Sequence, residues 1–284
     1  MKHRIFDTKK TVQVHGRVID LSTRPLIMGI LNVTPDSFYD GGKYLTSDEI
    51  LKRATSMLEN GADIIDIGGY SSRPGADRIT VEEEIDRARR ALKVVKKAFP
   101  DSLVSIDTFR AETARIAASE GAEIINDISG GELDEKMFET VAALKLPYIL
   151  MHMKGTPETM ASQNQYEHLT GDILQYFREK IQRLHELGVW DIIIDPGIGF
   201  SKNSQQNFHL ISQLDIFSAL NLPVLLGVSR KSFIYKTLNI SQEEALNGTT
   251  VVNTIGLLKN LSILRVHDVR EARQVIALLE NLKN

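Results

Sequence analysis

The chain has 284 residues, of which 42% are hydrophobic and 25% charged, and its formal net charge is −3 at pH 7. This length accommodates one large hydrophobic core or two small ones, and a mildly acidic chain without a basic block is not expected to bind nucleic acid. The chain has no cysteine, which excludes disulfides, thiolate nucleophiles and zinc–thiolate sites and agrees with a reducing compartment.

The first predicted element is a small hairpin over residues 11–22, where apolar and polar side chains alternate. The charged residues 1–10 before it lack the apolar segment of a signal peptide. No run in the chain is apolar for long enough to span a bilayer. We therefore expect a cytoplasmic protein without a membrane partner.

Eight short aliphatic runs follow, and each ends in a residue that can hydrogen-bond or carry charge. They are Leu26–Leu31 before Asn32, Ile64–Ile65 before Asp66, Leu103–Ile106 before Asp107, Ile124–Ile125 before Asn126, Tyr148–Met151 before His152, Ile192–Ile194 before Asp195, Val224–Val228 before Ser229 and Arg230, and Ile263–Val266 before His267. Runs with almost no polar alternation are typical of parallel strands buried on both faces. Their polar ends are then expected to meet at one end of one sheet.

Helix patterns lie between these runs, with apolar residues recurring every three or four positions. The clearest stripes run from Val81 to Phe99, from Ile173 to Leu184 and from Val269 to Leu279. Thr46 with Glu49, Thr80 with Glu83 and Ser241 with Glu244 have the spacing of capping boxes. Gly61, Gly121 and Gly188 each follow a helix pattern and precede a strand, which gives a weak internal repeat.

Eight βα units over about 250 residues predict an α/β fold, a TIM (β/α)8 barrel with the short N-terminal hairpin at its bottom. We expect one domain over residues 1–284, because no linker or low-complexity segment divides the chain. The alternative is an open, doubly wound sheet. That fold would favour a glycine-rich fingerprint after the first strand, which residues 29–35 do not supply.

Three predicted βα loops exceed the roughly 2–6 residues of a simple connection. They span Val33–Thr46, Gly68–Ile79 and His152–Leu169. In a barrel these loops lie on the active-site face, where long loops often close over a ligand.

Motifs at the ends of the predicted strands resemble those of the dihydropteroate synthase family over nearly the whole chain. The matching segments begin with Met28–Phe38, Ser71–Ala76, Ser105–Thr108 and Ile125–Ile128, and continue with Met151–Pro157, Asp195–Phe200, Ser229–Ser232 and Arg265–Val269. A single segment is weak, but all eight in this order are highly specific. The resemblance implies a transferase of folate biosynthesis that condenses 6-hydroxymethyl-7,8-dihydropterin pyrophosphate with p-aminobenzoate to give 7,8-dihydropteroate and pyrophosphate.

A pterin edge presents adjacent N–H donors beside acceptors, which carboxylates and amides can match. The residues implied to bind the pterin are Ser72, Asp107, Asn126, Met151, Asp195, Phe200 and Lys231. A strand-end Asp or Asn can also simply cap the next helix, and that alternative weakens when three of them lie in matching motifs.

Release of pyrophosphate needs stabilisation of the charge that develops on the leaving oxygen. Arg265 and His267 lie two residues apart on the last strand and can project to one face, which predicts a pyrophosphate clamp together with Asn32. Mg²⁺ prefers oxygen ligands and substrate phosphates. The resemblance implies Asn32 as its ligand, with Asp40 as a second.

The expected substitution is dissociative: ring electrons expel pyrophosphate, and the arylamine attacks the exocyclic methylene cation. Because an arylamine is uncharged at neutral pH, Asp107 is assigned electrostatic support of the cation rather than proton abstraction. The predicted catalytic residues are Asp107, Lys231, Arg73 and Asp40. The predicted p-aminobenzoate pocket consists of Phe38, Arg73, Pro74, Lys231 and Ser232. Sulfonamides, which mimic p-aminobenzoate, are expected to compete for it.

The chain departs from the family pattern at Tyr70, where Glu is frequent, at Ser72, where Thr is common, and at Ser201, where Gly is usual. Two other functions share part of the pattern: a folate-to-corrinoid methyltransferase and a pterin-binding module without turnover. The resemblance also implies a homodimer, to which the apolar helix around Val251–Leu258 is a candidate contributor.

Overall fold

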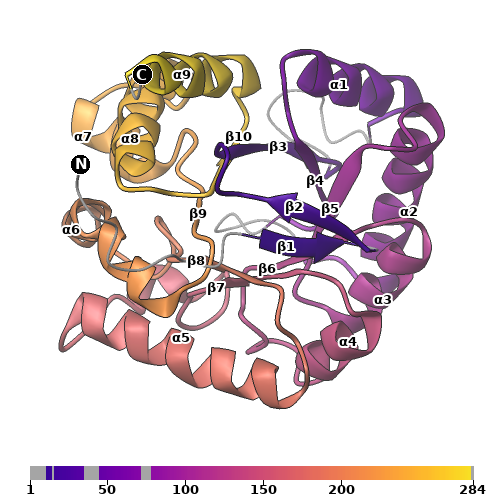
Figure 1. Ribbon diagram of the computed structural model, residues 1–284, viewed down its shortest axis with the longest axis horizontal. Coiled ribbons are helices and arrows are strands. Elements are labelled where there is room, and N and C mark those ends of the chain that lie inside the picture. Colours follow the sequence, from indigo (N-terminus) through magenta and orange to yellow (C-terminus); the bar gives the residue numbers. More distant parts are fainter. Residues whose placement is uncertain (1–10, 15, 35–44, 72–77, 283–284) are drawn as a thin grey trace.

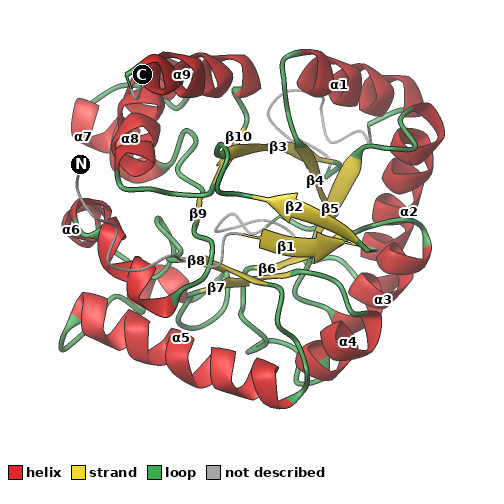
Figure 2. Ribbon diagram, in the orientation of Figure 1, coloured by secondary structure: helices red, strands yellow, loops and turns green. Residues whose placement is uncertain are grey.

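The computed structural model describes residues 11–14, 16–34, 45–71 and 78–282. In Figure 1 the strands of these residues lie inside a ring of helices, and a hairpin crosses the middle of the view (Figure 2 shows the same by element type). The parallel strands are, in chain order, β3 (Leu26–Asn32), β4 (Ile64–Gly68), β5 (Leu103–Asp107), β6 (Ile124–Asp127), β7 (Tyr148–Met151), β8 (Ile192–Asp195), β9 (Leu225–Leu226) and β10 (Ile263–Val266).

The eight strands close into a barrel. Their hydrogen-bonded order is β8-β7-β6-β5-β4-β3-β10-β9. The two ends of this order meet through a parallel bridge between Ile194 and Val224, beside which the Ile194 amide donates to the Pro223 carbonyl at 2.9 Å. The predicted barrel is therefore confirmed, and the open doubly wound sheet is wrong.

Helices alternate with the strands and cover the outside of the barrel (Figure 1). Within the described residues the α-helices are α1 (Ser47–Glu59), α2 (Val81–Ala98), α3 (Ala111–Ser119), α4 (Met137–Leu144), α5 (Leu169–Glu186), α6 (Ser204–Ser212), α7 (Ser232–Leu238), α8 (Leu246–Leu258) and α9 (Val269–Asn281). The short 3-10 helices are η1 (Met160–Ser162), η2 (Leu214–Leu220) and η3 (Glu243–Ala245).

The helix boundaries follow the predicted signals. At the start of α1, the Glu49 amide donates to Thr46 Oγ1 at 3.3 Å and the Thr46 amide donates to the Glu49 carboxylate at 2.7 Å, which completes a capping box. The repeated glycines Gly61, Gly121 and Gly188 have φ angles of 95°, 104° and 82°, a region that favours glycine. Each of them turns the chain sharply from a helix into the next strand.

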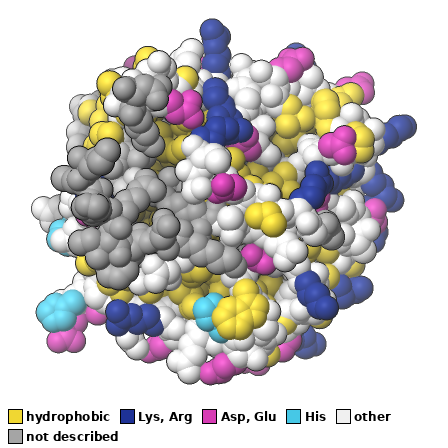
Figure 3. Space-filling model, in the orientation of Figure 1, with side chains coloured by type: hydrophobic (Ala, Val, Ile, Leu, Met, Phe, Trp, Pro, Cys, Tyr) yellow, Lys and Arg dark blue, Asp and Glu magenta, His cyan; other side chains and the backbone are white. Residues whose placement is uncertain are grey.

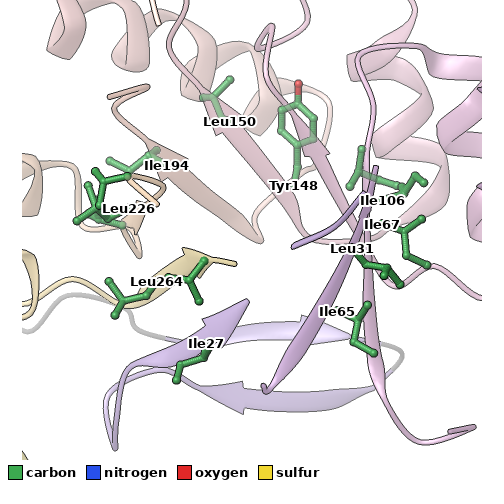
Figure 4. Packing of buried hydrophobic residues seen from close by; sticks show 14 of the residues in the cluster. Ile27, Leu31, Ile65, Ile67, Ile106, Tyr148, Leu150, Ile194, Leu226 and Leu264 are labelled. Carbon is green, nitrogen blue, oxygen red and sulfur yellow. The ribbon is translucent and has the colours of Figure 1, made fainter. Parts of the chain in front are cut away.

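Successive side chains along each strand point alternately toward the helices and into the barrel, which gives two apolar layers. Side chains such as Ile27, Ile65, Tyr148 and Leu226 face the helices and belong to the large outer core (Figure 4). Side chains at the strand starts fill the barrel instead and form a second cluster: Leu26, Met28, Ile64, Ile124, Ile149, Ile193, Leu225 and Ile263.

The hairpin covers this inner cluster. It consists of β1 (Thr11–Val14) and β2 (Arg17–Asp20), which pair antiparallel, and Val12 packs into the inner cluster from below. The predicted hairpin at the barrel bottom is thus confirmed, and the opposite end of the barrel carries the polar strand ends. On the face seen in Figure 3, basic and acidic side chains are interspersed. Among the described residues, no helix combines the length and the apolar character needed to cross a bilayer.

Candidate functional site

Polar side chains replace apolar ones inside the barrel toward the C-terminal ends of the strands. Asp66 of β4, Asn126 of β6, Asp195 of β8 and Arg265 of β10 stand above the inner apolar cluster, and Asp107 ends β5. The pairing register brings neighbours together, for example Asp107 beside Asn126. Because all these strands are parallel, their ends form one ring, as expected for the active-site face of a barrel.

Arg265 joins two carboxylates across this ring. Its Nε donates to Asp66 Oδ2 at 2.6 Å, and its Nη2 donates to Asp107 Oδ2 at 2.5 Å. The side-chain amide nitrogen of Asn126, Nδ2, donates to the same Asp66 oxygen at 3.1 Å. Asp66 is fully buried. The Asn126 carbonyl oxygen is therefore the group that this amide can offer to a ligand as an acceptor.

Burial and neighbouring charges shift the pKa values of two carboxyl groups in this ring, Asp107 and Asp195. Burial raises the pKa of Asp107 to about 7, with Arg265 opposing the shift and the negative charge of Asp66 adding to it. Burial likewise raises the pKa of Asp195, while the ammonium group of Lys231 opposes the shift. Asp107 thus changes its charge near neutral pH, which is typical of functional carboxylates.

Lys231 lies directly before α7 and reaches the loop between β8 and α6. Its Nζ donates to the Ile198 carbonyl at 2.5 Å and stands 4.4 Å from the centroid of the Phe200 ring. Gly199 has φ 86°, and a Cβ there would lie 2.7 Å from Lys231 Cδ, so this glycine admits the lysine stem. Burial lowers the pKa of Lys231 to about 8, with Asp195 opposing the shift.

An apolar wall stands beside the polar ring. Met151, at the end of β7, is buried in a small cluster with Ile128, Met153 and Met160, against which Phe200 packs. The two residues predicted to touch the pterin through apolar atoms, Met151 and Phe200, therefore belong to one surface. A flat heterocycle could lie on it with its polar edge toward Asn126 and Asp195.

The predicted pyrophosphate residues occupy the neighbouring sector, but Arg265 and His267 face different partners. Arg265 points inward to the carboxylates, whereas His267 Nδ1 lies 3.1 Å from Ser229 Oγ at the rim. Asn32 Oδ1 lies 3.1 Å from the position that a Gly68 Cβ would take, and Asp107 Oδ2 lies 3.9 Å from it. The missing side chain at Gly68 leaves space between these two side-chain oxygen atoms.

The remaining predicted site residues belong mostly to the loops after β3 and β4. Ser232 is described and lies exposed at the start of α7. The other predicted positions fall outside the described ranges: Phe38, Asp40, Ser72, Arg73 and Pro74. Within the described ranges, no three His, Cys, Asp or Glu side chains are grouped so that they could hold a metal ion.

Asp66 is a site residue that the sequence reasoning does not select. The sequence places Asp66 at the end of an aliphatic run, whereas β4 continues through it to Gly68, and its link to Arg265, 199 positions away, is not visible in the sequence. A usable signal is present: Asp66 is a carboxylate inside the otherwise apolar run Ile64–Ile67, and a buried charge requires a partner.

Substituting alanine for Gly197 tests how tightly the loop after β8 is built. Gly197 has φ 66°, a Cβ would lie 2.0 Å from the His152 carbonyl oxygen, and its amide donates to Asp195 Oδ1 at 2.8 Å. Gly197→Ala is expected to lower the free energy of unfolding by about 3 kcal/mol or more in urea titrations, because backbone atoms must move. Gly188→Ala is the control: it has φ 82° with open space around it, and about 1 kcal/mol is expected. Equal losses in both variants would contradict the steric argument.

Comparison with known proteins agrees with this geometry. A family model described as pterin binding enzyme matches residues 28–267. The dihydropteroate synthase of Escherichia coli (strain K12) is 41% identical over 268 residues, covering 93% of this chain and 94% of that protein. The Yersinia pestis dihydropteroate synthase, solved with a sulfonamide drug complex, has a TM-score of 0.90 and 37% identity, covering 96% of this chain and 98% of that one. The Thermus thermophilus dihydropteroate synthase, solved in complex with 4-aminobenzoate, has a TM-score of 0.85 and 33% identity, covering 96% and 99% of the two chains.

Proposed function

The chain belongs to the pterin-binding enzyme family, as a dihydropteroate synthase of folate biosynthesis, and on this premise we propose how its barrel joins a dihydropterin pyrophosphate to p-aminobenzoate. The observation that carries the proposal is the ring in which Arg265 braces Asp66 and Asp107 beside Asn126. This ring offers fixed acceptors of the kind that a pterin edge requires.

In the proposed complex, the pterin edge lies against Asn126, Asp107 and Asp195. The carbonyl of Asn126 and the carboxylate of Asp195 accept hydrogen bonds from ring N–H and amino groups. Phe200 and Met151 cover one face of the ring system, and Lys231 supplies a donor and a positive charge at the open side. Burial of this surface strengthens each of these polar contacts.

The proposed substitution is dissociative. The C–O bond to pyrophosphate breaks first, the electron pair leaves with the pyrophosphate, and a cationic exocyclic methylene remains on the pterin. The carboxylate of Asp107 stabilises that cation from a fixed position, as preorganised charges do in water-poor sites. The amine of p-aminobenzoate then forms the C–N bond and loses a proton to water.

Pyrophosphate is proposed to lie near Asn32, Arg265 and His267. Mg²⁺ fits the same sector, because the space left by Gly68 exposes the Asn32 amide oxygen to a ligand. The ion would neutralise charge on the phosphates when bound; Asn32 would hold it, with Asp40 as the second proposed ligand.

Removal of divalent ions by EDTA is expected to lower turnover at least tenfold, and added Mg²⁺ to restore it. Unchanged turnover in EDTA would contradict the proposed ion.

The direct test of the function is a product assay. Purified protein receives the pterin pyrophosphate and Mg²⁺, with and without p-aminobenzoate, and pyrophosphate and dihydropteroate are both quantified. Dihydropteroate formed in step with pyrophosphate supports the proposal. Tight binding of the pterin without release of pyrophosphate would contradict it.

The pH dependence of kcat/KM is expected to be bell-shaped. Asp107 must be ionised to support the cation, so activity should fall as the pH drops below its pKa of about 7. Lys231 must carry its proton, so activity should also fall as the pH rises above its pKa of about 8. In Lys231→Arg the alkaline limb is expected to move above about pH 10, because a guanidinium does not titrate there. An unmoved alkaline limb in this variant would assign it to another group.

The p-aminobenzoate pocket is proposed to include Lys231 and Ser232 together with Phe38, Arg73 and Pro74. Sulfonamides are expected to inhibit competitively with p-aminobenzoate, raising its KM and leaving kcat unchanged. Arg73→Ala is expected to raise the same KM, and an unchanged KM would contradict its place in the pocket. Full activity in saturating sulfonamide would argue against an ordinary p-aminobenzoate pocket.

We also propose a homodimer formed through α8. This helix divides its apolar residues: Val252 and Leu257 are buried in the large outer core, whereas Val251 and Leu258 are 51% and 66% exposed. Large exposed apolar side chains on one helix face are frequent at subunit interfaces. Leu258→Glu is expected to yield monomers in sedimentation experiments, whereas Leu51→Glu on α1 should not. A monomeric unmodified protein would overturn the proposal.

A further inference from the structure

Two long loops on the active-site face are fastened to each other by consecutive side chains. One loop connects β7 to α5 (residues 152–168), and the other connects β8 to α6 (residues 196–203). Ser201 and Lys202 of the second loop reach Lys154 and His152 of the first. Their contacts continue the pairing of β7 with β8 beyond the ends of the strands, where the sheet itself has stopped.

Ser201 is the centre of this connection. Its hydroxyl donates to the Lys154 carbonyl at 2.8 Å and accepts from the Lys154 amide, also at 2.8 Å. The Ser201 carbonyl accepts from Tyr166 Oη at 2.9 Å. The hydroxyl and the carbonyl of Ser201 thus both bind the other loop, and Ser201 is 2% exposed.

The backbone at Ser201 is held in an unfavourable conformation. Its φ angle is 52°, in the left-handed region that favours glycine. A serine persists there only where its surroundings hold it, and here the two bonds to Lys154 supply that hold. A glycine would fit this backbone without strain but would lose the hydroxyl that joins the loops.

Lys202 makes the neighbouring connection. Its Nζ donates to the carbonyls of Gly197 and Phe200 at 2.9 and 3.0 Å and lies 3.1 Å from His152 Nδ1. The lysine therefore ties the turn that carries Phe200 to the residue after β7. Ser201 and Lys202 together define what we name the loop clasp.

We propose that Ser201 is a positioning residue for the pterin substrate, which acts by joining the two loops before the ligand arrives. The apolar wall takes Phe200 from one of these loops and Met153 from the other, so its shape depends on how the loops sit. When a binding-competent arrangement is only partly populated, the apparent affinity falls by that fraction. The loop clasp keeps the two loops in the arrangement that binds the pterin. This inference rests on the proposed function.

The test compares Ser201→Gly and Ser201→Ala in the full chain. Both lack the hydroxyl, but only alanine retains the backbone strain, so effects common to both report the hydroxyl. The KM for the pterin pyrophosphate is expected to rise about fivefold in both, with kcat within about twofold, because the bound state is unchanged once formed. Hydrogen exchange of the Lys154 amide is expected to become at least tenfold faster. Ser162→Ala, which removes a hydroxyl bond inside the first loop only, is the matched control and should change neither quantity.

A pterin KM within twofold of the unmodified protein in both variants would overturn the proposal, and so would a fall in kcat at constant KM. Unaltered Lys154 exchange would overturn the clasp itself. If the unmodified protein forms no dihydropteroate, the proposed function fails, and calorimetric titration with the pterin pyrophosphate still tests the clasp through its binding constant. Melting temperatures of the variants separate a local loosening from general unfolding.

Discussion

Asp107→Asn is expected to lower kcat/KM by about a thousandfold while the barrel stays folded. The substitution keeps the size of the side chain and removes the negative charge that faces the developing cation. Removal of one preorganised charged or hydrogen-bonding group from a water-poor site typically costs about 100- to 1,000-fold in rate. Single-turnover measurements should place the loss in the chemical step, because Asn126 and Asp195 still bind the pterin edge.

The control for this variant is Glu112→Gln. Glu112 lies on α3 and pairs with Arg115, at 2.6 Å, on the exposed surface. The same loss of a carboxylate charge there is expected to leave kcat/KM unchanged. If Asp107→Asn retained more than a tenth of the activity, electrostatic support by Asp107 would be refuted. The dissociative step would then need another source of stabilisation.

Local signals in the sequence are enough to predict the fold. The glycines at 61, 121 and 188 predict three helix ends, and each has the positive φ that such an end requires. The predicted bounds of an element differ from the structure where the local signals in the sequence are weak. The run Val224–Val228 predicts a full strand, but only Leu225–Leu226 pair as β9, and Val224 forms the isolated bridge to Ile194 at the closure of the barrel. Ser241 and Glu244 form the reciprocal cap, yet it opens the 3-10 helix η3 before α8 begins.

The individual residues of the site can be predicted from the sequence, but the hydrogen bonds and ion pairs that join them cannot. Asp107, Asn126 and Asp195 are predicted because each follows an aliphatic run, and the closed barrel gathers the ends of such strands without further information. The pairing of Arg265 depends on which inward side chains sit opposite each other, which no local pattern in the sequence reveals. The sequence therefore assigns Arg265 with His267 to a clamp, whereas its described partners are Asp66 and Asp107. The residues at the pterin edge would be common to a synthase and a methyltransferase. The similarity to dihydropteroate synthases, such as the Escherichia coli enzyme at 41% identity, identifies the synthase.

The second large effect concerns stability and follows from that network. Arg265→Ala is expected to lower the free energy of unfolding at pH 8 by about 3–5 kcal/mol, because it leaves the buried carboxylate of Asp66 and the largely buried carboxylate of Asp107 without their cation. Turnover should also be lost, since the ring that holds Asn126 and Asp107 loses its brace. Urea titration of the variant and the unmodified protein measures the difference.

The pH dependence of the stability of Arg265→Ala shows whether charge causes its loss of stability. Burial raises the pKa of Asp107 and Arg265 opposes that shift, so without Arg265 this carboxyl keeps its proton to higher pH and the folded variant binds more protons than its unfolded chain. Its stability therefore falls as the pH rises, and the deficit relative to the unmodified protein should be smaller at pH 5 than at pH 8. The double variant Asp66→Asn, Arg265→Ala removes one of the two charges and is expected to recover part of the stability at pH 8 but none of the activity. A deficit that is equal at both pH values, together with no recovery in the double variant, would mean that Arg265 stabilises the barrel by packing alone. In that case its ion pairs would be consequences of the fold rather than the reason that two buried carboxylates are tolerated inside the barrel.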